Sequence, residues 1–119
     1  MKPIAFVFLH SPHGTTGGRE GLDLVLATAA FTNEIGLFFI GDGVLQIYPF
    51  QKPDKILSRH YVNSFQILEL YDIKYIYVCG MSLIERGIHL KTEFLISVQI
   101  LSPSDLKKKL HLFKKILTF

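Results

Sequence analysis

The sequence has a single cysteine, no tryptophan and no apolar run long enough to span a membrane. One cysteine excludes an internal disulfide and thiol exchange of the CxxC kind. It also leaves too few ligands for a structural zinc site, even when the five histidines are counted. The first apolar segment stops at His10, Ser11 and Pro12, which is too early for a secretory signal. We therefore predict a cytoplasmic protein with no membrane segment and no metal or cofactor.

The charge is unevenly distributed along the 119 residues. The formal net charge is +3, yet five lysines lie within nine residues near the C-terminus, so the rest of the chain is net negative: Lys107, Lys108, Lys109, Lys114 and Lys115. Such a run is more typical of a solvated helix face than of a nucleic-acid site. Contact of the Lys107 to Lys115 region with a partner or with RNA remains an open alternative.

The apolar content is high for a chain of this length. Hydrophobic residues make up 49% of the sequence, and the mean hydropathy is +0.31. A domain of about this size has a large surface relative to its volume, so part of this apolar content is expected at the surface. The composition therefore predicts one domain, residues 1–119, that buries apolar surface against a partner.

Strand patterns alternate with helix patterns along the chain. The expected strands are Ile4–Leu9, Leu37–Ile40, Lys74–Cys79, Phe94–Leu101 and Ile116–Phe119. The expected helical segments are Arg19–Thr32 (closed by Asn33–Gly36), Val44–Tyr48, Gln51–Tyr71 with Leu57, Tyr61, Phe65 and Leu68 inward, Met81–Arg86, and one that starts at Ser102. Parallel strands need crossover helices. The predicted fold is an α/β three-layer sandwich with a mostly parallel sheet of about five strands.

Three loops are expected at the carboxyl ends of these strands, where ligands gather in such sheets. They are His10–Gly18, Gly41–Gly43 and Cys79–Ser82. The first resembles a phosphate loop only superficially, because it lacks both the Walker pattern and the dinucleotide fingerprint. A tight glycine-rich turn is favoured over an anion site, and a small-ligand or nucleotide-binding domain is the weakest of the functional alternatives.

Cys79 is the candidate catalytic residue. It ends a predicted buried strand just before a helix, and aligned peptide dipoles at a helix start favour a thiolate. Arg86, one to two turns further on, would add positive charge. A thiolate here would act as a nucleophile or carry transferable sulfur, but free cysteines are also among the most buried residues. No base accompanies Cys79 in sequence, so packing is slightly favoured.

The histidines give little support for catalysis or metal binding. His10 and His13 lie in the first loop without a carboxylate or serine partner at a recognisable spacing, and His60, His89 and His111 are scattered. Two interpretations of His10 and His13 stay open: they act as acid-base groups or flank a thiol, or they are simply polar loop residues.

Several short motifs nevertheless occur together in one order. They are His13-Gly14, Gly18 to Asp23, Gly41 to Val44, Gln51-Lys52-Pro53, Leu70-Tyr71-Asp72, Cys79, Arg86-Gly87 and the final apolar strand to Phe119. In this combination the chain resembles the DsrF-like members of the DsrE/DsrF/DsrH sulfur-relay family. The resemblance extends over nearly the whole sequence.

The resemblance implies a heterohexamer with TusB-like and TusD-like subunits. Such a complex takes persulfide sulfur from TusA and passes it through TusE towards the 2-thio group of the tRNA wobble uridine. The resemblance therefore implies that this chain acts on tRNA only indirectly, through the proteins that follow it in the relay. In that family the sulfur carrier is a cysteine of the TusD-like subunit at the equivalent strand end. The resemblance therefore implies an accessory chain, and a direct sulfurtransferase that carries persulfide on Cys79 is the alternative.

Overall fold

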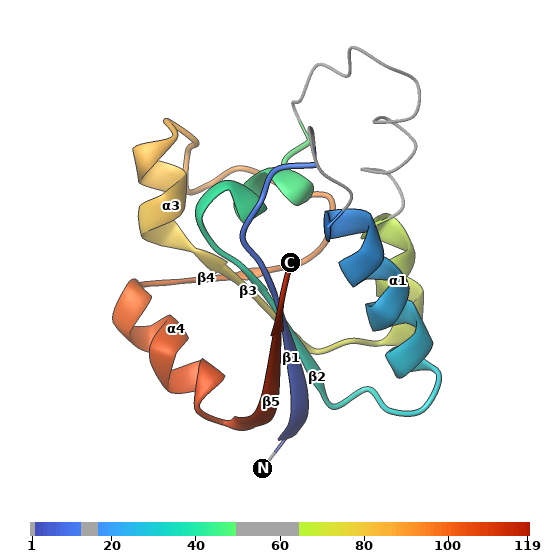
Figure 1. Ribbon diagram of the computed structural model, residues 1–119. Helices are drawn as coiled ribbons and strands as arrows, with labels where there is room; N and C mark the ends of the chain where they lie inside the picture. Colours follow the sequence, from blue (N-terminus) through green and yellow to red (C-terminus); the bar gives the residue numbers. More distant parts are fainter. Residues whose placement is uncertain (1, 13–16, 50–64) are drawn as a thin grey trace.

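A five-stranded, all-parallel sheet forms the centre of the computed structural model, which describes residues 2–12, 17–49 and 65–119 (Figure 1). The strand order is β4-β3-β2-β1-β5. The strands are β1 Lys2–Phe8, β2 Ile35–Phe39, β3 Tyr75–Cys79, β4 Gln99–Leu101 and β5 Phe113–Thr118. Every strand pair is parallel, because a helical crossover returns the chain to the same end of the sheet each time.

Helical segments cover both faces of the sheet. They are α1 Gly17–Ala29, the 3-10 segments η1 Gly41–Gln46 and η2 Phe65–Tyr71, α3 Gly80–Glu85 and α4 Pro103–Leu110. Figure 1 shows α1 and α4 on opposite sides of the strands. We call the two sides the α1 face and the α4 face. The predicted three-layer α/β sandwich is confirmed.

The α1 face carries the larger core, and aromatic side chains fill its centre. Phe8 stacks on Phe39 with ring centroids 5.1 Å apart, and it meets the edge of Phe65 at 5.6 Å. The same core contains Leu22 and Val25 from α1, so the apolar stripe of this helix is what holds it on the sheet.

The α4 face has a thinner core, formed by alternate residues of the same strands. Its buried members are Ala5, Val7, Phe38, Tyr77, Cys79, Leu106 and Phe113. Leu106 is the buried residue of α4, with 3% of its surface exposed. The Ser102 hydroxyl caps this helix by accepting a hydrogen bond from the Asp105 amide at 3.2 Å, as the Ser-Pro-Ser-Asp sequence predicts.

The largest error of the sequence prediction concerns the fourth strand. Phe94–Leu101 was expected to pair along its length, but only Gln99–Leu101 forms β4. The Leu95 amide instead donates to the Ile47 carbonyl at 3.1 Å, and the Ser97 amide donates to Glu69 Oε1 at 3.2 Å. These donors are satisfied outside the sheet. The apolar residues of this segment, with Ile96 buried among them, pack against the larger core instead of extending β4.

Smaller differences occur at other element ends. Ile35 and Gly36 belong to β2 rather than closing the first helix, which already ends at Ala29. The closing strand begins at Phe113, three residues before the predicted start, and ends at Thr118. Phe65 and Leu68 are buried as predicted, but on a 3-10 segment, while Leu57 and Tyr61 lie outside the described residues. Over the described ranges, no helix combines the length and hydropathy needed to cross a membrane.

Candidate functional site

The carboxyl ends of β1, β2 and β3 meet at one rim of the sheet. Phe8 is level with Phe39, and Phe39 is level with Val78, so the loops that follow begin side by side. The Ile40 amide donates to the Phe8 carbonyl at 3.1 Å. Buried Gln46 donates through Nε2 to the His10 carbonyl at 2.8 Å. The structure thus brings together the described parts of the three predicted loops, and residues 13–16 lie outside its description.

The turn after β2 requires glycine for two different reasons. Gly41 has a φ of 60°, a left-handed conformation that side chains disfavour. Gly43 has no room, because a Cβ there would lie 1.7 Å from the carbonyl oxygen of Phe8. The Gly41-Asp42-Gly43 motif therefore allows the backbone of η1 to lie directly against the end of β1.

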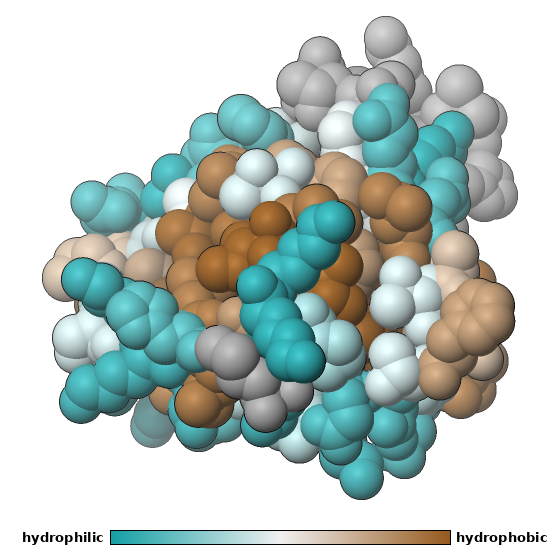
Figure 2. Space-filling view, turned by 60° about the horizontal axis from the view of Figure 1, so that its bottom comes forward, coloured by the Kyte–Doolittle hydropathy of each residue, from teal (hydrophilic) through white to brown (hydrophobic). Residues whose placement is uncertain are grey.

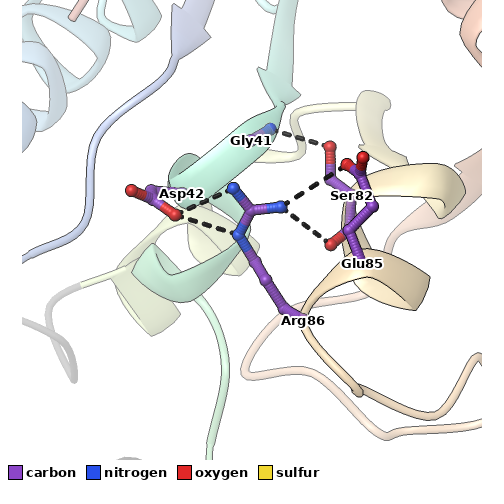
Figure 3. A network of polar contacts seen from close by, with 5 residues as sticks. All are labelled: Gly41, Asp42, Ser82, Glu85 and Arg86. Carbon is purple, nitrogen blue, oxygen red and sulfur yellow. Dashed lines mark hydrogen bonds and ion pairs between the residues drawn. The ribbon is translucent and has the colours of Figure 1, made fainter.

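A polar network fastens this turn to α3 (Figure 3). Arg86 donates to Asp42 Oδ1 through Nε at 2.9 Å and approaches the same oxygen through Nη2 at 2.8 Å. Its Nη1 donates to the Ser82 carbonyl at 3.0 Å and lies 3.8 Å from Glu85 Oε1. We call Asp42, Ser82 and Arg86 the rim clamp.

Ser82 is the buried member of the rim clamp. Its hydroxyl oxygen accepts a hydrogen bond from the Gly41 amide at 2.8 Å, so one residue of α3 binds the turn directly while its carbonyl binds Arg86. The hydrogen bond from the charged Arg86 guanidinium to the Ser82 carbonyl is charge-assisted, and such bonds are stronger than those between neutral groups. The clamp consequently fixes the position of α3 relative to the ends of β1 and β2.

Cys79 is buried beside this rim, with 5% of its surface exposed. Strand alternation places its side chain on the α4 face with Tyr75 and Tyr77, and it belongs to the core that includes Leu106. The residue immediately precedes α3, but its side chain makes no capping hydrogen bond. Cys79 therefore packs between the sheet and α4 rather than beneath α3.

The predicted role of Arg86 also changes. Its guanidinium was expected to add positive charge near Cys79, but it is directed to Asp42, Ser82 and Glu85. Among the described contacts, none joins Arg86 to Cys79. Arg86 instead connects the turn after β2 to α3 through Asp42 and the Ser82 carbonyl.

Tyr77, two residues before Cys79, has an altered ionisation. Burial raises the pKa of its phenol above the ordinary value of 10.0, and the neighbouring Tyr75 adds to this shift. Lys109 lies over the Tyr77 ring, with its Nζ 5.9 Å from the ring centroid. The core residues near the thiol on the α4 face are therefore apolar or, in the case of Tyr77, a phenol that keeps its proton and has the Lys109 ammonium over its ring.

Two of the described histidines take part in hydrogen bonds. His10 contributes its backbone carbonyl, and His89 accepts a hydrogen bond from the Lys91 amide through Nδ1 at 3.0 Å. Within the described residues, no cluster of three or more potential metal ligands occurs. His13 and His60 lie outside the described residues.

Sequence reasoning missed the rim clamp because its members are far apart in the chain. Asp42 and Arg86 are separated by 44 positions, and no local pattern pairs them. A signal was present in the motifs themselves, since Gly-Asp-Gly and Arg-Gly belong to the set that suggested the family.

An all-parallel sheet with loops meeting at the carboxyl rim places the chain in the class of three-layer α/β proteins. Its fold is similar to the ychN protein from E. coli, with a TM-score of 0.80, 23% identity and full coverage of both chains. The model of the DsrE/DsrF-like family matches residues 2–119. The chain is 48% identical over 119 residues to Protein TusC of Klebsiella pneumoniae (strain 342), with both sequences covered completely. The chain belongs to the DsrE/DsrF-like family.

Proposed function

We propose that this chain is an accessory subunit of a sulfur-relay complex. The full-length likeness to Protein TusC and the family membership support a place in such a complex. The proposed complex contains TusB-like and TusD-like subunits in a heterohexamer, receives sulfur from TusA and delivers it to TusE in the cytoplasm. Its final product is the 2-thio group of the tRNA wobble uridine.

Burial of Cys79 is the observation that carries the accessory role. A sulfur carrier must present its thiolate to a donor and then to an acceptor, so its sulfur needs access from solvent. Cys79 is 5% exposed and belongs to the same buried core as Tyr77 and Leu106. We therefore assign it to packing, and assign the persulfide to a sister subunit.

Exposed apolar side chains support assembly with other subunits. Phe31 is 90% exposed and Leu70 is 84% exposed. Met81 and Ile84 of α3 and Leu90, which follows α3, are also exposed. Such surface favours association in water. We expect the isolated chain to self-associate or aggregate in sedimentation experiments at micromolar concentration. A stable monomer under those conditions would count against the proposed complex.

The role of Cys79 is tested with the assembled complex. We expect Cys79→Ala to leave tRNA thiolation close to the wild-type level, measured as 2-thiouridine in tRNA from cells in which this gene replaces the resident copy. Cys79→Ser is the matched variant, because it keeps a side chain of similar size without a sulfur nucleophile.

A second measurement separates packing from chemistry. The complex is incubated with a labelled sulfur donor, and peptides containing Cys79 are analysed by mass spectrometry. We expect no added sulfur on Cys79. Added sulfur, together with loss of thiolation in both variants while the complex still assembles, would establish the alternative, in which this chain carries persulfide itself.

A further inference from the structure

A positively charged surface lies away from the rim, on α4 and β5. It consists of Lys107 and Lys108 on α4, Leu112 at the turn, and Lys114 and Ile116 on β5; we call this set the basic face. All five residues are exposed. Ile116 is level with Ala5 of the α4-face core, so Ile116 lies on the side of the sheet that α4 covers. Lys115 points to the opposite side.

The lysines of the basic face are available for binding. Within the described residues, no carboxylate forms an ion pair with Lys107, Lys108 or Lys114; the recorded ion pairs involve Arg86. Lys109 differs, since its ammonium lies over the Tyr77 ring. Among the described acidic residues, Asp105 lies in the first turn of α4, and Glu34 accepts a hydrogen bond from the Tyr75 hydroxyl at 3.3 Å.

A hollow of about 520 Å³ adjoins the basic face. It is lined by Lys2, Pro3, Glu34, His111 and Leu112, so Leu112 belongs to both features. Leu112 is 44% exposed and Ile116 is 45% exposed, which places apolar surface among the lysines. Figure 2 turns the end that carries the N-terminus towards the viewer, and an apolar area crossed by hydrophilic side chains occupies its middle.

We propose that the basic face binds an acidic protein segment that carries an apolar anchor residue. The lysine ammonium groups complement carboxylates, and the apolar anchor enters the hollow against Leu112. A phosphate backbone complements the lysines equally well but makes no use of Leu112 or Ile116. The basic face also lacks arginine and aromatic residues, which nucleic-acid sites use to contact bases. An acidic protein is therefore the occupant that the observations favour.

The position of the basic face separates this binding from the rim. Lys2 is level with Phe113, and its amide donates to the Leu112 carbonyl at 2.9 Å, so Leu112 lies at the amino ends of the strands. Cys79 lies at the carboxyl end of β3, level with Leu101. The inference consequently concerns docking alone, and it does not depend on sulfur transfer or on Cys79.

The test measures binding of fluorescent peptides to the full chain by anisotropy, in the oligomeric state in which the chain purifies. One peptide has eight glutamates around a central leucine, and the second has serine in place of the leucine. A 12-base-pair RNA duplex is the third probe. We expect the leucine peptide to bind roughly 10-fold more tightly than the serine peptide, as burial of one leucine side chain provides, and more tightly than the duplex.

Variants then locate the site. We expect the double variant Lys107→Glu and Lys108→Glu to weaken binding of the leucine peptide about 10-fold or more, and Leu112→Ser to remove its advantage over the serine peptide. Lys91→Glu, an exposed lysine between α3 and β4, is the charge-matched control for Lys108→Glu and is expected to change binding less than about 2-fold. Circular dichroism verifies that each variant is folded.

Three results would overturn the proposal. The first is tighter binding of the RNA duplex that depends on the lysines and not on Leu112, which would identify a nucleic-acid surface. The second is equal affinity for the leucine and serine peptides. The third is an equal effect of Lys91→Glu and Lys108→Glu, which would indicate that only net charge matters.

Discussion

The two faces of the sheet differ in what they contain. Among the described residues, 17 buried side chains form the core of the α1 face, whereas seven form that of the α4 face. In the part of the chain that the structure describes, α1, η1, η2 and α3 contribute buried residues to the first core, and α4 is the one helix that contributes to the second. The α1 face therefore supplies most of the apolar stabilisation. The face with the smaller core, the α4 face, contains the Cys79 thiol and the buried Tyr77, and the basic face adjoins it.

The most direct test of this difference uses neighbouring residues of β2. Phe39 packs in the α1 face and Phe38 in the α4 face, and both are fully buried. We expect Phe39→Ala to lower the free energy of unfolding by about 4 kcal/mol and Phe38→Ala by about 3 kcal/mol, because a single covering helix collapses more easily into the space. Urea unfolding measures both values. A larger loss for Phe38→Ala would reverse the comparison.

The adjacent residues at the end of β3 provide a smaller version of the same test. Val78 faces the α1 core and Cys79 faces the α4 core. We expect Val78→Ala to cost about 2 kcal/mol and Cys79→Ala about 1 kcal/mol, since the second change removes only one atom from a packed site. The measurement is again urea unfolding. A cost above that of Val78→Ala would indicate that Cys79 does more than fill space.

The rim clamp joins the α1 face to α3 by polar contacts, so its contribution is expected to be smaller. Arg86→Lys keeps the charge but loses the two-nitrogen contact with Asp42, and we expect a cost of about 1 kcal/mol. Glu85→Gln is the control, with almost no effect, because Glu85 lies 3.8 Å from Arg86 and is 64% exposed. Hydrogen exchange of the Gly41 amide, which donates to Ser82, is expected to accelerate in Arg86→Lys.

The smallest expected effect is the pH dependence that Tyr77 gives to the α4 face. The folded state raises the pKa of this phenol above 10.0, so the unfolded chain loses the proton first as the pH rises. Its contribution is complete below pH 10 and is lost as the pH rises through the folded pKa. We expect Tyr77→Phe to flatten the decline in thermal stability above pH 10, relative to Tyr75→Phe. An unchanged slope would contradict the assigned cause.

Much of the architecture was predictable because it follows from local patterns. The runs before His10 and Gly80 are apolar without alternation, which is typical of parallel strands covered on both faces, and both form strands. Ser102 and Pro103 start α4 as their residue types predict. The strand prediction for Phe94–Val98 was wrong because these apolar residues pack against the α1-face core without pairing with β3, and composition alone does not distinguish packing from strand pairing.

The candidate site was predictable in place but not in geometry. The rule that loops meet at the carboxyl ends of parallel strands located Gly41–Gly43 and Cys79–Ser82 on one rim. The rule does not state which face a side chain occupies, and one position along a strand decides whether Cys79 faces α1 or α4. It also contains no information on the pairing of Asp42 with Arg86.

The sequence by itself determined the class of the fold, the single thiol at a strand end and the concentration of lysines near the C-terminus, because these depend on periodicity, residue type and spacing. Only the tertiary structure decided that Cys79 is enclosed by α4, that Arg86 binds the turn after β2, and that Lys115 and Ile116 face opposite sides of β5. Burial and pairing arise when segments distant in the chain meet, and the register of the sheet selects which side chains share a surface.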